Sequence, residues 1–185
     1  GLWWESNDFS ISANYISPNG SSSKPSGVVD ELGAEDCSES GGIATDCAGS
    51  NGTVQIAYAP ENWGIAAAYN YTSKNAGALY AGNGTPLANR FSNNGNNSSF
   101  GLSAWWSPEE ASWFPSISTG WGYNSITNDD DTFKIGFSSA TTQSWYVGLQ
   151  WADAFMKGNT LGMAVGQPTF VTSVDFKSDY SDSKY

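Results

Sequence analysis

The sequence of 185 residues contains no histidine and only seven lysine and arginine residues. Without histidine, Ser-His-Asp catalysis, Cys-His catalysis and His-ligated metals are excluded. Eighteen acidic residues give a formal net charge of −11, so the chain is unsuited to binding phosphate backbones and we expect no nucleic-acid partner. There is also no apolar run of the roughly 18 residues that suggest a membrane-spanning helix.

Cysteine is scarce as well, because Cys37 and Cys47 are the only two. They flank a segment of small and polar residues, and we expect them to form a disulfide that restricts the unfolded chain by about 3 kcal/mol. Two free thiols in a flexible loop are the alternative. A disulfide implies an oxidising compartment. The chain begins Gly1-Leu2-Trp3-Trp4, without an initiator methionine or a targeting segment, which predicts a mature form or an internal fragment.

Aromatic residues are abundant at 15%, and the dominant hydrophobic period is two, which indicates β-strands. Large apolar residues alternate with small or polar ones in segments 9–16, 53–59, 65–72, 99–106, 116–124, 144–152 and 160–166, and Leu2 to Trp4 predict the tail of a further strand. The links between them are alternately short and long, which predicts an up-and-down meander. We predict no amphipathic helix. The link from Ser125 to Gln143 predicts a small extra hairpin, because Phe133, Ile135 and Phe137 alternate.

The two sides of these strands differ in a way that is unusual for a soluble protein. One side is large and apolar, whereas the other is small and polar and carries almost no charge. The outer face of a soluble sandwich normally carries charged residues, whereas a transmembrane barrel turns an uncharged apolar face to lipid and a polar face to its lumen. Most of the nine tryptophans lie near short links, as expected of an aromatic girdle at a membrane interface. The pattern predicts an all-β fold, an antiparallel up-and-down transmembrane β-barrel.

This prediction assigns individual residues to the two faces. Those expected to contact outer-membrane lipid are Val54, Ile56, Ile65, Ala67, Phe100, Leu102, Val147, Leu149, Met163 and Val165. Those expected to line the pore are Gln55, Asn70, Thr72, Ser103, Ser118, Asn124 and Gln150, with Gly148 and Gly162 beside them. Arg90, the only arginine, lies in the long link 73–98, where it is a candidate for a loop that folds inward and constricts the pore. An exposed loop arginine is the alternative reading.

Two acidic motifs are candidates for chemical sites. Asp129, Asp130 and Asp131 lack the alternating ligands, glycine and terminal glutamate of an EF-hand, which favours an acidic external loop. Glu109 and Glu110 are adjacent and follow Pro108, so they point apart in a turn rather than forming a glycosidase pair. We expect no catalytic residue, no metal and no cofactor.

Three stretches resemble a known family. They read AYAPENWGIAAAYNY from residue 57 to 71, WFPSISTGWGYNS from 113 to 125 and SWYVGLQWADAFMKGNTLGMAVGQPTFVT from 144 to 172. They resemble the cyanobacterial outer-membrane porins, relatives of the OprB-type carbohydrate-selective porins. The resemblance implies a barrel of roughly 16 strands, which needs far more chain than this. It also implies a homotrimer in the cell outer membrane and a separate domain that binds peptidoglycan. Neither that domain nor a closing strand is recognisable, so residues 1–185 are expected to be a middle portion of the porin β-barrel domain.

The predicted function is passive diffusion of ions and small hydrophilic solutes through an outer-membrane porin. The resemblance allows inorganic ions, including iron, or small sugars. The alternative is a secreted β-sandwich carbohydrate-binding module, in which Trp and Tyr side chains stack on sugars. A complete eight-stranded barrel is a third possibility. A need for detergent during purification distinguishes the porin from the secreted module.

Overall fold

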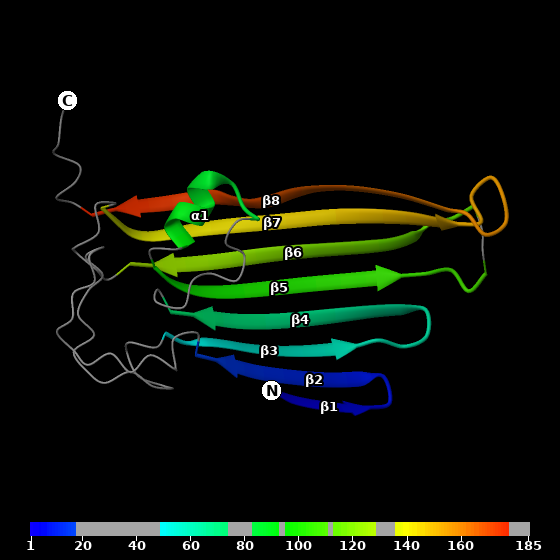
Figure 1. Ribbon diagram of the computed structural model, residues 1–185, viewed down its shortest axis with the longest axis horizontal. Coiled ribbons are helices and arrows are strands. Elements are labelled where there is room, and N and C mark those ends of the chain that lie inside the picture. Colours follow the sequence, from blue (N-terminus) through cyan, green and yellow to red (C-terminus); the bar gives the residue numbers. More distant parts are fainter. Residues whose placement is uncertain (18–48, 74–82, 93–94, 111–112, 129–135, 178–185) are drawn as a thin grey trace.

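The computed structural model describes residues 1–17, 49–73, 83–92, 95–110, 113–128 and 136–177. Eight strands form one antiparallel sheet in which the spatial order follows the sequence order (Figure 1). They are β1 (Leu2–Ser6), β2 (Phe9–Ile16), β3 (Asn51–Tyr58), β4 (Trp63–Thr72), β5 (Asn96–Trp106), β6 (Ser116–Thr127), β7 (Phe137–Ala152) and β8 (Thr160–Phe176). The predicted all-β, antiparallel, up-and-down organisation is confirmed.

The sheet is open rather than closed. β1 and β8 form its two edges and do not pair with one another. The described strands therefore do not make a complete eight-stranded barrel, which was one of the alternatives. The short links β1–β2, β3–β4, β5–β6 and β7–β8 all lie at one end of the sheet, and we call this the short-link end (Figure 1).

β7 and β8 are longer than their hydrophobic pattern indicates, with 16 and 17 residues. Phe137 opens β7 instead of belonging to a separate hairpin, while Phe133 and Ile135 lie outside the described residues. The pairing of these two strands shifts register between Phe137 and Ser139, between Thr141 and Thr142, and between Gln143 and Trp145. Each irregularity interrupts the period of two. The alternation therefore predicted only the regular half of each strand.

One helix, α1 (Pro86–Ser92), was not predicted. The hydroxyl of Thr85 accepts a hydrogen bond from the amide of Ala88 at 3.4 Å, and Pro86 occupies the first helical turn, where its missing amide costs nothing. Seven residues are too few for a helical period to stand out from the sequence. No helix in the described part of the chain is both long and apolar enough to span a membrane.

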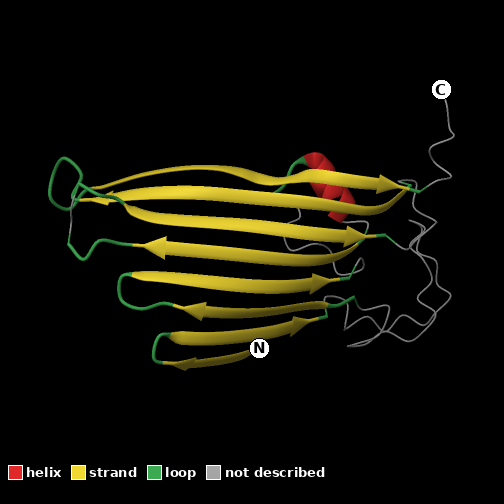
Figure 2. Cartoon of the chain, turned by 180° about the vertical axis from the view of Figure 1, so that it is seen from behind, coloured by secondary structure: helices red, strands yellow, loops and turns green. Residues whose placement is uncertain are grey.

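The buried apolar core is small and lies beneath α1. It consists of Phe91, Ile126, Phe137 and Ala140, with Val171 and Val174 packed against it. The rings of Phe91 and Phe137 meet edge to face, with their centroids 4.8 Å apart. Viewed from behind, the opposite side of the sheet has no described element over it (Figure 2). One sheet with a helix at one end of one face is therefore the whole of the described architecture.

Candidate functional site

The strand register places all ten residues predicted to contact lipid on one side of the sheet, which we call the apolar face. Tyr58, Ile65, Ala104, Thr119 and Val147 stand opposite one another in one cross-strand row, and the neighbouring row joins Ile56, Ala67, Leu102, Trp121 and Trp145. These side chains do not form a packed core, since Ile65 is 52% exposed and Met163 is 60% exposed. The apolar face is therefore uncovered by the described residues.

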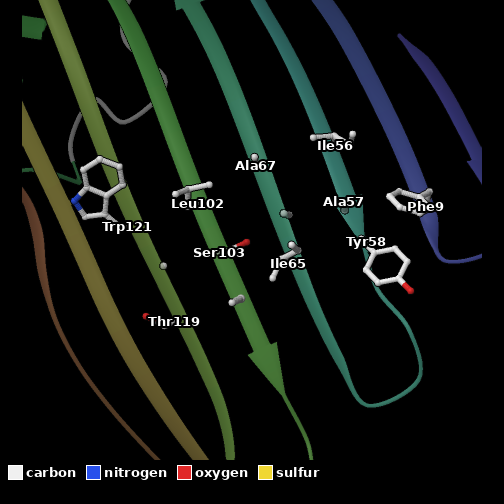
Figure 3. Close-up of a pocket in the computed structure, with 13 residues that line it drawn as sticks. Phe9, Ile56, Ala57, Tyr58, Ile65, Ala67, Leu102, Ser103, Thr119 and Trp121 are labelled. Atoms are coloured by element: carbon white, nitrogen blue, oxygen red, sulfur yellow. The ribbon is translucent and has the colours of Figure 1, made fainter.

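A shallow groove of about 450 Å³ lies across the middle of the apolar face (Figure 3). Small side chains line its centre, and Phe9, Tyr58 and Trp121 lie toward its margins. None of its lining residues carries a charge. Most of the side chains that line it are apolar, so the groove offers an apolar surface in the middle of this face.

The opposite side, which we call the polar face, is built from small side chains. Gly101, Gly122 and Gly148 lie there beside Ser103 and Ser118. Glu5 and Asp175 are the only charged residues in the eight strands, and both lie close to a strand end. The middle of the polar face is therefore uncharged, and most side chains there, the ring of Tyr146 excepted, are small.

Two aromatic rings lie across glycines on the polar face. A Cβ atom added at Gly120 would collide with the ring of Tyr146, and one added at Gly64 would collide with the indole of Trp105. Tyr146 and Gly120 are direct cross-strand partners, as are Trp105 and Gly64. Rings in this position shield the exposed backbone of a glycine within a strand. The two pairs explain why these glycines are compatible with long strands.

A hydrogen-bonded network joins polar side chains of β3 and β4 at the end of the sheet opposite the short-link end. The Asn70 amide donates to the Thr53 hydroxyl at 2.7 Å and to the Asn51 side-chain oxygen at 3.0 Å. The Thr72 hydroxyl donates to the Asn70 oxygen at 2.8 Å, and the Asn51 amide donates to the Thr72 hydroxyl at 2.9 Å. A comparable bond of 2.8 Å joins the Asn124 amide to the Thr142 hydroxyl.

The seven residues predicted to line the pore all lie on the polar face, but their environments differ. Gln55, Ser103 and Gln150 are exposed, and Ser118 is half-buried. Asn70 and Thr72 are buried in the hydrogen-bonded network, and Asn124 is buried and bonded to Thr142. The contribution of these seven residues to a pore stays a prediction. The side chains of the exposed residues are accessible on the polar face, whereas the buried ones form hydrogen bonds within the sheet.

The segment 83–92, which we call the crossing segment, lies over the polar face. It belongs to the link between the neighbouring strands β4 and β5, yet the amide of Thr85 donates a hydrogen bond of 2.8 Å to the carbonyl of Thr169 in β8. The register shift in β7–β8 leaves Pro168 and Thr169 without partners in β7. The Thr169 carbonyl is therefore free to accept this bond, and proline has no amide to lose.

A hollow of about 470 Å³ lies between the crossing segment and the sheet. Asn83 contributes from the segment, while Ser103, Gly120, Tyr146 and Gln167 contribute from four strands. Arg90 lies in the last turn of α1 and is exposed, so the predicted constriction residue belongs to a segment that does cover the polar face. Its effect on solutes stays a prediction. The sequence Thr85-Pro86 is the one signal that could have predicted the helix start.

Other predicted features lie elsewhere. Cys37, Cys47 and the triplet from Asp129 to Asp131 are outside the described residues. Glu109 accepts a hydrogen bond of 3.1 Å from the Asn62 amide at the short-link end. Within the described ranges, no three residues of the types that ligate metals come together in a group that could hold an ion.

A scan against models of protein families found no match to this chain, and searches of curated proteins and of solved structures found none either. Its function must therefore be inferred from the two faces of the sheet and from the segment that crosses one of them.

Proposed function

We propose that this chain forms part of the wall of an outer-membrane porin, a passive channel for ions and small hydrophilic solutes. The apolar face contacts lipid and the polar face borders the water-filled lumen. The observation that carries this proposal is a single sheet whose large apolar side chains are exposed along its length. In water such a continuous apolar surface favours association, whereas in a bilayer it is the expected outer surface of a barrel.

The secreted β-sandwich module fits these observations less well. A sandwich buries its large apolar side chains between two packed sheets. The described strands form one sheet, and the side chains that would make the core of a sandwich are exposed. The nearly uncharged polar face would also be a poor outer surface for a soluble module.

The open sheet is proposed to be a portion of a larger barrel. Strand edges that lack partners cannot remain in the hydrocarbon region, because each unsatisfied backbone group there costs several kcal/mol. β1 and β8 therefore require further strands to complete the wall. The sequence resemblance to cyanobacterial porins supports a barrel of roughly 16 strands that assembles as a trimer, with a separate domain binding peptidoglycan.

Solutes are selected by size and weakly by charge. The crossing segment occupies space above the polar face and narrows the lumen there. The glycine and serine residues of the polar face add little side-chain volume and so leave room in the lumen. The short links carry Asp8, Glu61, Glu109, Glu110 and Asp153 against one basic residue, Lys157, so this mouth attracts cations modestly.

Single-channel recording on the complete protein tests the proposal. Insertion into a planar bilayer should give stepwise conductance that rises with salt concentration, with a modest preference for cations. The detergent buffer without protein is the control. A protein that stays soluble and monomeric without detergent, and gives no conductance steps, would show that the sheet is not a channel wall.

A further inference from the structure

A second groove lies at the short-link end, between the β5–β6 and β7–β8 links. The indole nitrogen of Trp151, near the end of β7, donates a hydrogen bond of 3.0 Å to the carbonyl of Trp113 in the β5–β6 link. The groove has a volume of about 510 Å³ and is lined chiefly by Trp113, Trp151, Asp153, Phe155 and Leu161. Trp151 and Leu161 are cross-strand partners at the end of the apolar face, so the groove continues that face to its margin.

Phe155 is held in an unfavourable position in the β7–β8 link. Its φ is +62°, a region that bulky residues rarely occupy, and the residue is 94% exposed. Asp153 also has a positive φ, of +55°, and its carboxylate accepts a hydrogen bond of 2.7 Å from the Gly158 amide, which closes the turn. The ring therefore makes little contact with the described protein to offset the backbone strain. Strain of this kind in an exposed turn points to a binding partner.

Lys157 supplies the charge that such a partner would meet. It lies two residues from Phe155 in the same link, it is exposed, and it is the one basic residue in the described short links. Amphipathic aromatic side chains with a neighbouring lysine are the combination that is favoured where hydrocarbon gives way to lipid headgroups. The carboxylate of Asp153, which lines the groove, makes a doubly negative ligand unfavourable here, whereas a headgroup that carries a phosphate and a balancing positive charge is accommodated.

We propose that this groove binds one phospholipid molecule at its headgroup end. The Lys157 ammonium pairs with the lipid phosphate, and the glycerol and the first methylenes of an acyl chain lie against Trp113, Trp151 and Phe155. This inference rests on the proposed function, because a lipid reaches the groove only when the apolar face is in a membrane. A membrane lipid is favoured over a peptide because the groove is continuous with the apolar face.

The test offers the complete protein a choice between two lipids. The protein is reconstituted in vesicles of equal parts phosphatidylcholine and digalactosyldiacylglycerol with matched acyl chains, and it is then released in mild detergent. Native mass spectrometry counts the lipids that remain bound. We expect one retained phosphatidylcholine in preference to the phosphate-free galactolipid. Lys157→Gln should lower that preference about two- to fivefold, the range expected for the loss of one exposed ion pair.

Matched variants separate the two parts of the groove. Lys157→Arg should keep the preference, and Lys177→Gln, at the opposite end of the sheet, should leave it unchanged. Phe155→Gly fits the positive φ and removes only the ring, so it should reduce retention of both lipids alike. Heat-dependent migration in gel electrophoresis checks that each variant is folded.

The outcomes distinguish the two proposals. A protein that conducts ions but retains both lipids equally would overturn the phospholipid site and leave the channel standing. Displacement of the bound lipid by soluble glycerophosphocholine would show a free headgroup site and would also overturn it. A protein that neither enters vesicles nor conducts would remove the channel proposal and this one with it.

Discussion

Thr85 donates its backbone amide to the carbonyl of Thr169 at 2.8 Å, although Thr85 belongs to the link between β4 and β5 and Thr169 lies in β8. This bond carries the link across the polar face of β5, β6 and β7. α1 then follows directly, and Phe91 on it packs against Ile126 and Phe137. The crossing segment is thus attached at both ends, by a hydrogen bond at one and by apolar packing at the other.

Gly84→Val should weaken that attachment. A Cβ at Gly84 would lie 2.9 Å from the side-chain oxygen of Asn89 and 3.0 Å from the Thr169 carbonyl, so the segment must shift. We expect a loss of about 1–3 kcal/mol in unfolding free energy and a larger single-channel conductance, because the segment moves off the polar face. Gly101→Val is the matched control, since nothing lies within 4 Å of its Cβ position. An unchanged conductance in Gly84→Val would show that the segment does not narrow the pore.

Arginine substitutions at two consecutive positions of β7 test the orientation of the sheet. Leu149 lies on the apolar face opposite Met163, and Gln150 lies on the polar face opposite Gly162. Leu149→Arg should destabilise the folded protein by about 2–4 kcal/mol, because it places a charge in lipid. Gln150→Arg should fold normally and shift selectivity toward anions. Urea titration and reversal potentials measure the two effects, and equal destabilisation by both would contradict the assignment of faces.

Gly120→Ala should disturb the packing of the Tyr146 ring on the polar face. The added methyl occupies the position of that ring, so overpacking should cost about 1–3 kcal/mol. The double variant Gly120→Ala with Tyr146→Ala should recover part of this loss, because the colliding ring is gone. A double-mutant cycle measured in urea gives the coupling energy. Additive effects would mean that the ring does not depend on the glycine.

The disulfide between Cys37 and Cys47 stays a prediction, since both residues lie outside the described ranges. Mass analysis of the mature protein under non-reducing conditions should find the pair bridged, about two mass units lighter than after reduction, because each bridge forms with the loss of two hydrogen atoms. Alkylation of both thiols without prior reduction would contradict it.

Much of the sheet could be predicted because strand geometry is local. Successive side chains on an extended backbone point to opposite sides, so the alternation of Val54, Gln55 and Ile56 decides which residues share a face before any strand has a partner. The alternating link lengths then predict the meander, because antiparallel neighbours need only short turns. The predictions that failed on β7 and β8 fall at bulges, where the period of two is interrupted.

Tertiary structure alone decided what covers the polar face. The amino-acid sequence determined the two faces through a local periodicity, which needs no knowledge of distant residues. The crossing segment depends instead on contacts between residues far apart in the chain, such as Phe91 with Phe137 and Thr85 with Thr169. Burial of Asn70 and Thr72 is likewise a property of the assembled sheet. These contacts form only when the packing energy offsets the entropy cost of closing the loop. A periodic pattern along the sequence therefore cannot predict them.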